Sequence, residues 1–344
     1  MILNFKKSGY LVINAWSQDF KSFIKLTTGW LPYKSTQKYL GVMFSDTGLI
    51  KHDINVFIKR KSKEINVKLA SFLRKNEFAP IHVKLKVVNA CINSALMYGC
   101  ESWGNFPLNP VEVLQRKALK MVLGLSRSTS NEILYTESGF RPLKPSIYKR
   151  QLKFFRKIKE NCANKPNSVV SMLFIDGLNK KTSFLKHYIK LDNTFPSLFD
   201  CFTYYKTMHD EQVREKIIEK HRVDKNSILG TYFSVNPNLE SHIMYREVCC
   251  NENDRTILSK YRVGCHMLKI QSERLTSSVA SRETRLCKCN LELQTLEHVI
   301  IQCPLTEIVR EAHNLQHNNL TAFFKDNNLV KLATSLKAIE KLVL

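Results

Sequence analysis

The chain has 344 residues, enough for two modest domains with a sizeable hydrophobic core. Hydrophobic residues make up 44% of the chain and aromatic residues 10%, which excludes an intrinsically disordered protein. The formal net charge of +23 indicates an acidic partner.

The positive charge is concentrated in the first half of the chain. Residues 1–160 contain 28 Lys and Arg against 10 Asp and Glu, whereas residues 161–344 contain 25 against 20. This asymmetry favours nucleic acid as the partner over a basic composition that only keeps the protein soluble. An anionic membrane surface is disfavoured, because the basic segments lack the Trp and Phe face of an interfacial helix.

The N-terminus does not read as a secretory signal, because the apolar run Met1–Phe5 is short and is followed by Lys6 and Lys7. No apolar run approaches the roughly 20 residues that cross a bilayer. Ten cysteines without such a signal suggest a reducing compartment. We therefore expect a cytoplasmic or nuclear protein that is not secreted and not in a membrane.

Two short strands are expected near the N-terminus. Residues 7–14 read as a strand entered from a turn, and the apolar run 39–44 reads as another, followed by a turn at 46–48.

A long basic helix is predicted over residues 53–76, with Asp53 as its cap. Its apolar stripe recurs at helical spacing, at Phe57, Ile65, Leu69 and Phe72. Seven cations lie between Lys59 and Lys75 with one acid, Glu64, among them. Like charges at this spacing repel by a few tenths of a kcal/mol per pair, and a phosphate backbone would relieve that repulsion.

More helices follow this segment. The patterns predict helices over residues 80–98, 111–125, 132–138 and 146–161, and the last of these is again basic. From these helices and the preceding one we predict the following phosphate contacts: Lys59, Arg60, Lys61, Lys63, Lys68, Arg74, Lys84, Lys86, Arg150, Lys153, Arg156 and Lys157. Tyr98 and Trp103 are candidates for base stacking or, more simply, for core packing.

The second half of the chain is less informative. Residues 184–191 and 202–221 are predicted to be helical, whereas residues 227–238 contain Gly and Pro and read as a loop with one strand. The tail has an apolar stripe of helical spacing, which predicts a docking or capping helix: Phe323, Leu329, Leu332, Leu336, Ile339 and Val343.

A candidate metal site precedes the tail. Cys287, Cys289, His298 and Cys303 form the pattern Cys-x-Cys-x8-His-x4-Cys, which offers three thiolates and one imidazole. Such ligands suit a closed, tetrahedral structural zinc site. A short helix around His298 would place Cys303 just past its end, so that the ligands converge. The alternative is three reduced cysteines near an unrelated histidine, and Cys265 or His266 are possible substitutes if the narrow spacing fails.

Other active-site motifs are absent from the sequence. It contains no Gly-x-Gly-x-x-Gly, no phosphate-binding loop and no Gly-x-Ser-x-Gly elbow, and it has only 11 Gly. We therefore expect no small-molecule substrate. There is also no Asp-Asp dipeptide, although polymerase chemistry needs grouped carboxylates to hold two Mg²⁺ ions.

Two parts of the chain resemble reverse transcriptases of non-LTR (LINE-type) retrotransposons. The first resemblance rests on Tyr39-Leu40-Gly41-Val42, the turn at 48–52 and Tyr98-Gly99-x-Glu101-x-Trp103. It covers residues 7–161 and implies the end of the palm, with a hairpin near the primer end, followed by a helical thumb that grips the template–primer duplex. It also implies that the Asp-Asp motif would lie upstream of Met1.

The second resemblance is to the C-terminal Cys-Cys-His-Cys knuckle of the same proteins. It rests on Arg262-x-Gly264-Cys265-His266, the four candidate ligands, Pro304 and Arg310. These knuckles have two or three residues between the first two cysteines, whereas this chain has one, Lys288.

Together these features predict a mostly α fold with a small β-hairpin region at the N-terminus. We predict remnant palm strands in 1–52, a thumb bundle in 53–161, a helical linker in 162–255, a zinc-knuckle region in 256–310 and C-terminal helices in 311–344. The implied function is binding of RNA or an RNA–DNA or DNA duplex by a fragment of an RNA-directed DNA polymerase. Zinc would be structural, and Mg²⁺ would belong only to the intact parent, so the chain alone is expected to be inactive. The alternatives are a zinc-dependent protein-interaction module with an acidic partner and a retroelement remnant without function.

Overall fold

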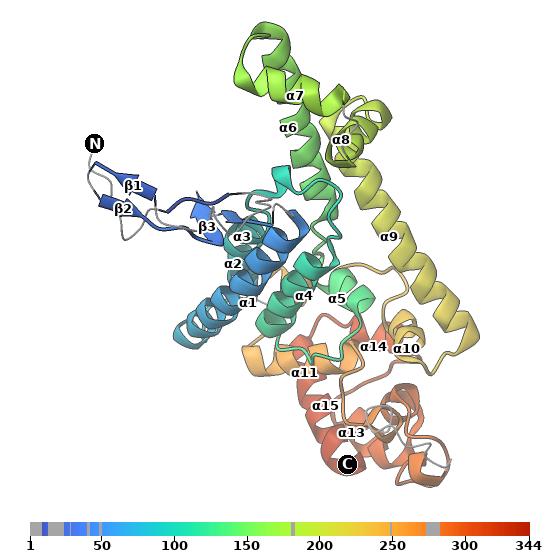
Figure 1. Ribbon diagram of the computed structural model, residues 1–344. Helices are drawn as coiled ribbons and strands as arrows, with labels where there is room; N and C mark the ends of the chain where they lie inside the picture. The colour runs from blue at the N-terminus through green and yellow to red at the C-terminus, as the bar shows by residue number, and fades with distance from the viewer. Residues whose placement is uncertain are drawn as a thin grey trace. The chain divides into compact units, whose positions relative to one another are not determined.

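The computed structural model describes residues 9–12, 24–27, 29–39, 42–47, 50–179, 183–247, 250–272 and 283–344. Helices dominate these residues, and the strands form two antiparallel hairpins near the N-terminus (Figure 1). The predicted mostly α fold with a small β region is therefore confirmed. None of the described helices combines the length and the apolar character needed to cross a membrane.

The hairpins are built from β1 (Ile24–Leu26) with β2 (Gly29–Leu31), and from β3 (Thr36–Tyr39) with β4 (Val42–Ser45). The prediction of one strand over residues 39–44 is wrong, because Tyr39 pairs with Val42 on the opposite strand. A segment with a glycine between two apolar runs has the same local pattern whether it is one strand or a tight hairpin. Half of the strand predicted over residues 7–14 lies outside the described residues; in the described half, Tyr10 forms an isolated parallel bridge with Tyr33.

Close packing divides the chain into two compact units. One unit draws on residues 1–70, 93–114 and 143–203, and the other on residues 71–92, 115–142 and 204–344. Three of the described α-helices have residues in both units: α1 (Ile50–Lys75), α4 (Asn109–Leu123) and α9 (Leu198–Val223). The five segments predicted from the sequence are not tested by this division and stay predictions.

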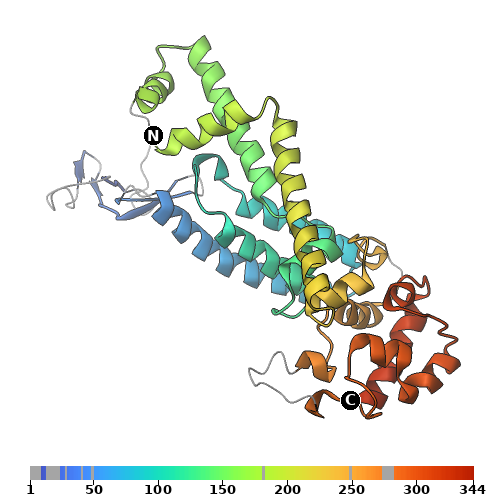
Figure 2. The ribbon, with the colours of Figure 1, turned by 90° about the vertical axis from the view of Figure 1, so that its right-hand side faces the viewer.

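The first unit also contains α3 (Ser94–Leu96), α6 (Lys144–Asn164), α7 (Val169–Asn179) and α8 (Ser183–Thr194). Figures 1 and 2 show α7 and α8 beside α6, and Phe155 of α6 is stacked on Tyr188 of α8. Gln151 of α6 donates to the carbonyls of Cys100 and Gly104, at 3.0 and 3.1 Å. These bonds hold the loop before α4 against α6.

Trp103 belongs to the core of this unit. It is 6% exposed and makes edge-to-face contacts with Phe57 of α1 and with Phe106. Core packing is therefore the role of Trp103, whereas Tyr98 is 48% exposed.

The helices of the second unit are α2 (Ile81–Val87), α5 (Asn131–Ser138), α10 (Ile228–Val235), α11 (Glu252–Arg262), α12 (Lys269–Ser272), α13 (Glu307–Ala312), α14 (Leu320–Phe324) and α15 (Leu329–Val343). A π-helical turn (Val88–Asn93) follows α2, so the helix predicted over 80–98 is interrupted. The apolar stripe predicted for the tail is buried throughout, on α14 and α15, and α15 packs along α11.

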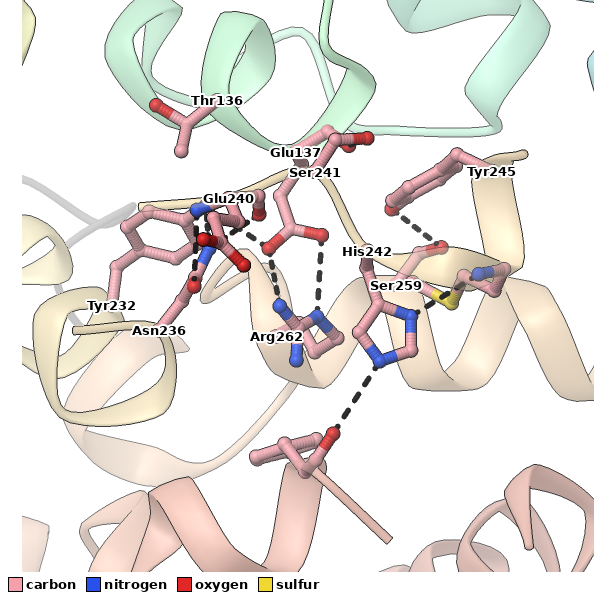
Figure 3. Close-up of polar contacts among 12 residues, drawn as sticks. Thr136, Glu137, Tyr232, Asn236, Glu240, Ser241, His242, Tyr245, Ser259 and Arg262 are labelled. Carbon is pink, nitrogen blue, oxygen red and sulfur yellow. Dashed lines mark hydrogen bonds and ion pairs between the residues drawn. The ribbon is translucent and has the colours of Figure 1, made fainter. Parts of the chain in front are cut away.

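A buried ion pair lies at the centre of the second unit (Figure 3). Arg262 of α11 donates to both carboxylate oxygens of Glu137 on α5, at 2.7 and 3.2 Å. Tyr232 of α10 donates to the same carboxylate at 3.0 Å and accepts from Asn236 at 2.9 Å. Both charges are buried away from water, so the desolvation cost of each is offset by its interaction with the other.

The segment 227–238, predicted as a loop with one strand, forms α10 instead. Ser227 caps this helix by accepting from the amide of Gly230 at 3.0 Å, and Tyr232 and Val235 are buried. Gly230 is needed for packing, because a Cβ atom there would lie 2.2 Å from the carbonyl oxygen of Asp224. Gly in this segment predicts a loop, but the cap at Ser227 and close packing on the preceding turn offset its low helix propensity.

The predicted cap at Asp53 is also wrong, because α1 begins at Ile50 and Asp53 lies within its first turn. A carboxylate there still interacts favourably with the positive end of the helix dipole. The helices predicted over 111–125, 132–138, 146–161, 184–191 and 202–221 are confirmed as α4, α5, α6, α8 and α9.

Candidate metal centre and basic helix faces

Four side chains converge in the second unit. The potential ligand atoms of Cys287, Cys289, His298 and Cys303 all lie within 4.8 Å of one another. The sulfur atoms of Cys287 and Cys303 are 3.7 Å apart, and the Cys289 sulfur is 3.2 Å from Nε2 of His298. Within the described residues, this is the one group of three or more Cys, His, Asp or Glu with the geometry of a metal site.

The distances can be compared with a tetrahedral zinc site. With Zn–S bonds of about 2.3 Å and a Zn–N bond of about 2.0 Å, the sulfurs would lie about 3.8 Å apart and the nitrogen about 3.5 Å from sulfur. The observed 3.7 and 3.2 Å are close to these edges. The residues therefore fit a four-coordinate metal without a large rearrangement.

A tight turn makes the one-residue spacing between the first two cysteines workable. Leu286 and Leu293 form an antiparallel bridge, and the amide of Cys287 donates to the carbonyl of Glu292 at 2.8 Å. Asn290 adopts a left-handed conformation with φ of 60° and donates to the carbonyl of Cys287 at 2.9 Å. Asn tolerates this conformation better than most residues, so the chain can turn back directly after Cys289.

The other two ligands lie at the two ends of one helical turn. His298 begins a π-helical turn (His298–Gln302), and Cys303 follows it directly, as predicted. The amide of Cys303 donates to the carbonyl of His298 at 2.7 Å. Thr306 then donates to the carbonyls of Val299 and Cys303, at 2.8 and 3.0 Å, which fixes the backbone after the last ligand.

Gln294 ties the ligand turn to the rest of the second unit. Its side chain is fully buried, accepts from the amide of Lys269 at 2.7 Å and donates to the carbonyl of Val343 at 2.9 Å. The ammonium group of Lys269 donates to the carbonyl of Leu286 at 2.8 Å. Packing on α12 and α15 therefore orients the turn that carries Cys287 and Cys289.

Burial sets the electrostatics of the cluster. It raises the pKa of the Cys303 thiol to about 12 and lowers the pKa of His298, so that the neutral imidazole is favoured. Burial also raises the pKa of Cys289, but a hydrogen bond from the Leu291 amide and contacts with neighbouring thiols lower it below its usual value overall. Nδ1 of His298 is buried and has no hydrogen-bond partner among the described residues.

The substitute ligands considered for the site are not used. The sulfur of Cys265 lies 3.1 Å from the hydroxyl of Thr129, and the ring of His266 stacks on Tyr261. Neither residue belongs to the four-ligand cluster.

The cations predicted on α1 fall into two groups. Lys59, Lys63 and Arg74 are exposed and, at 100° per residue, lie within about 60° of one another around the helix. Lys68 is also exposed, on another side of α1. Arg60 and Lys61 lie within 3.5 and 3.1 Å of the Glu64 carboxylate, and this pairing lowers the pKa of Glu64.

A second exposed basic face lies on α6. Arg150, Lys153 and Lys157 lie within about 60° of one another around this helix, and all three are exposed. Arg150 is 3.9 Å from the carboxylate of Glu101, a weak surface pair.

Two predicted phosphate contacts have structural partners instead. Lys84 is 4% exposed and donates to the carbonyl of Glu77 at 2.8 Å, so its charge lies inside the second unit. Arg156 is half-buried and bonds to Asp192 at 2.8 Å and to two backbone carbonyls. Lys84 is therefore buried and not available as the predicted phosphate contact, whereas Lys86 is exposed.

Comparison of the chain with protein-family models, with curated proteins and with solved structures finds no match. The residues and their geometry are therefore the basis for a functional assignment.

Proposed function

We propose that this chain binds an RNA or RNA–DNA duplex through phosphate contacts, as the thumb and C-terminal part of a LINE-type RNA-directed DNA polymerase. The observation that carries the proposal is the row of exposed cations on α1, formed by Lys59, Lys63 and Arg74. These three side chains have no ion-pair partner among the described residues, so their charge is available to an acidic ligand. The family assignment rests on the sequence resemblance.

Energetics favours a polyanion over a solvated surface for this row. Lys59 and Lys63 lie one turn apart and repel each other by a few tenths of a kcal/mol, which a helix without a ligand must tolerate. Each phosphate neutralised by a cation releases condensed counterions and adds about −0.9 to the slope of log K against log salt. The face on α6 offers three further contacts of the same kind. Such contacts hold a duplex in place but do not read its sequence.

We further propose that Cys287, Cys289, His298 and Cys303 hold one structural zinc ion. The near-tetrahedral spacing of their ligand atoms supports this assignment. All four positions are filled by protein ligands, so zinc would serve folding of this region and would leave no open position for substrate.

The chain itself is proposed not to polymerise DNA. Its sequence contains no Asp-Asp dipeptide of the kind that supplies two of the Mg²⁺ ligands in reverse transcriptases. Mg²⁺ and polymerase activity would belong to an intact parent protein.

A salt titration with matched variants tests the proposal. The triple variant Lys59→Ala, Lys63→Ala, Arg74→Ala should bind a blunt RNA–DNA duplex with a log–log salt slope shallower by about 3 than that of the wild-type chain. The control variant also removes three exposed cations, from other elements, and should keep the wild-type slope: Lys220→Ala, Lys325→Ala and Lys341→Ala.

Two outcomes would contradict the proposal. One is a wild-type slope near zero, which would favour the alternative of an acidic protein partner recognised by other means. The other is an equal effect of both triple variants, because binding would then depend on net charge and not on the row of cations on α1.

A further inference from the structure

A polar cleft of about 540 Å³ lies within the second unit and was not anticipated from the sequence. Its walls come from three separate segments: the end of α5 with the following residues to 141, the middle of α9 from 206 to 214, and residues 238–246. These segments are far apart in the chain, so no local sequence pattern could predict the cleft. Its volume is in the range of sites that hold small organic ligands.

Four cationic side chains line this cleft, namely Arg141, Lys206, Arg214 and Arg246. Arg141 is held by Asp210 at 3.1 Å. Arg246 donates to a backbone carbonyl at 3.2 Å, which leaves its charge uncompensated. Lys206 and Arg214 have no side-chain partner among the described residues. Among the residues that the structure describes, no carboxylate pairs with these three cations, which lie on two walls of the cleft.

Aromatic and acceptor groups share the cleft with these cations. Phe140 is half-buried beside Gly139, whose φ of 68° lets the chain turn at the end of α5. Tyr135 is buried and contacts the ring of His209 edge-to-face at 5.3 Å. Burial lowers the pKa of His209, so the imidazole is neutral near pH 7.

Acidic groups decide what kind of anion the cleft suits. Glu211 and Glu240 also line it, so a ligand that offers only negative charge would be repelled by part of the wall. A nucleotide carries both kinds of group, because its phosphate is anionic and its base carries amino groups that a carboxylate can accept from. Its flat base can also stack on an aromatic ring next to an arginine.

We propose that this cleft binds an unpaired nucleotide of a single-stranded RNA or DNA segment. In this arrangement Lys206 and Arg214 contact the phosphate, Phe140 stacks on the base, and a wall carboxylate accepts from a base amino group. The inference rests on the proposed nucleic-acid binding and extends it, because it assigns a separate site to single-stranded nucleic acid. The volume fits one or two nucleotides and is too small for a duplex.

The test uses the full chain and two labelled RNA–DNA probes, a blunt duplex and the same duplex with an unpaired tail of six nucleotides. The ratio of the two dissociation constants isolates the single strand from the duplex. For the wild-type chain we expect the tail to tighten binding by about tenfold, the order of one stacked base. The double variant Lys206→Ala, Arg214→Ala and, separately, Phe140→Leu should bring this ratio close to one, while blunt-duplex binding changes little.

A matched control distinguishes the effect of removing positive charge from the effect of disrupting the cleft. Lys220→Ala with Lys225→Ala removes two exposed cations from the end of α9 and the turn after it, outside the cleft, and should keep the tail effect. Circular dichroism of each variant checks folding, and Phe140→Tyr, which keeps a ring, should keep the tail effect if stacking is the cause.

The two proposals fail in different ways. If the wild-type chain binds the blunt duplex but the tail adds nothing, or if the cleft and control variants act alike, the cleft assignment is overturned and duplex binding stands. If the chain does not bind the blunt duplex but binds the isolated six-nucleotide strand through Lys206 and Arg214, the duplex proposal is overturned and the cleft assignment stands without it.

Discussion

Removing the carboxylate of Glu137 should destabilise the second unit more than any exposed charge change. In Glu137→Gln the shape is kept, but Arg262, which is 4% exposed, loses its counter-ion. In the wild-type chain, Arg262 donates to both carboxylate oxygens of Glu137, at 2.7 and 3.2 Å. In the amide one of these oxygens is replaced by an NH₂ group, which cannot accept, so one of the two hydrogen bonds is lost. Breaking a buried pair in this way costs about 3–5 kcal/mol, because an uncompensated charge stays buried.

Native-state hydrogen exchange, read by mass spectrometry on peptides from α5, α10 and α11, measures this loss within the second unit. The matched control is Glu132→Gln on the same helix, where the partner Lys216 is largely exposed. Because Lys216 can be resolvated when its partner is removed, the control should lose less protection than Glu137→Gln.

A double variant separates loss of the pair from loss of a charge partner. In Glu137→Leu with Arg262→Met both charges are gone, and at least half of the lost stability should return, because apolar replacement of a buried pair is often neutral. If Glu137→Gln costs no more than Glu132→Gln, the buried pair does not have the role assigned to it, and the reasoning is refuted.

Three further predictions concern the metal cluster, a half-buried histidine and a closely packed glycine. The purified chain should contain about one zinc per molecule by elemental analysis. Cys303→Ser should abolish zinc binding and Cys265→Ser should not. Zinc retained by both variants would refute the assigned ligand set. Burial, and then the charge of Arg262, lower the pKa of His242 to about 4 in the folded chain, so protonation favours the unfolded state. The contribution of His242 to stability is therefore complete above the unfolded pKa of about 6.5 and is lost as pH falls toward 4. In urea unfolding, His242→Gln should lose less stability between about pH 6.5 and 4 than the wild-type chain. An equal loss of stability would contradict the assignment. Gly230→Ala should lower the free energy of unfolding, measured from the urea midpoint, by about 1–3 kcal/mol, because its Cβ would lie 2.2 Å from a backbone oxygen. The control Gly177→Ala would meet only a movable leucine side chain, so it should lower the free energy of unfolding by less.

Local patterns in the sequence were sufficient for the main helices. The stripe through Phe57, Ile65 and Leu69 predicted α1, and all three side chains are buried. The metal ligands were also found from spacing, because Cys287, Cys289, His298 and Cys303 lie within 17 residues and are brought together by one turn and one short helix. Periodicity and short-range spacing are properties of a segment, so they can be read before the fold is known.

Periodicity failed where a contact with backbone a few residues away decides the role of a residue. Gly230 indicated a loop, yet contact with the segment before it makes a helix with glycine the stable choice. Lys84 had the position of a surface cation, but the carbonyl of Glu77 accepts from it in the interior. In both cases the deciding contact is absent from the periodicity of the segment itself.

The sequence by itself determined the mostly helical fold, the basic character of α1 and α6 and the four candidate metal ligands, because each follows from side chains a few positions apart. Only the tertiary structure decided which cations are exposed, how Arg262 meets Glu137 across 125 residues, and that three separate segments enclose a cleft. Burial and long-range pairing depend on how segments pack against one another, and the sequence of a single segment does not specify which segments it will contact.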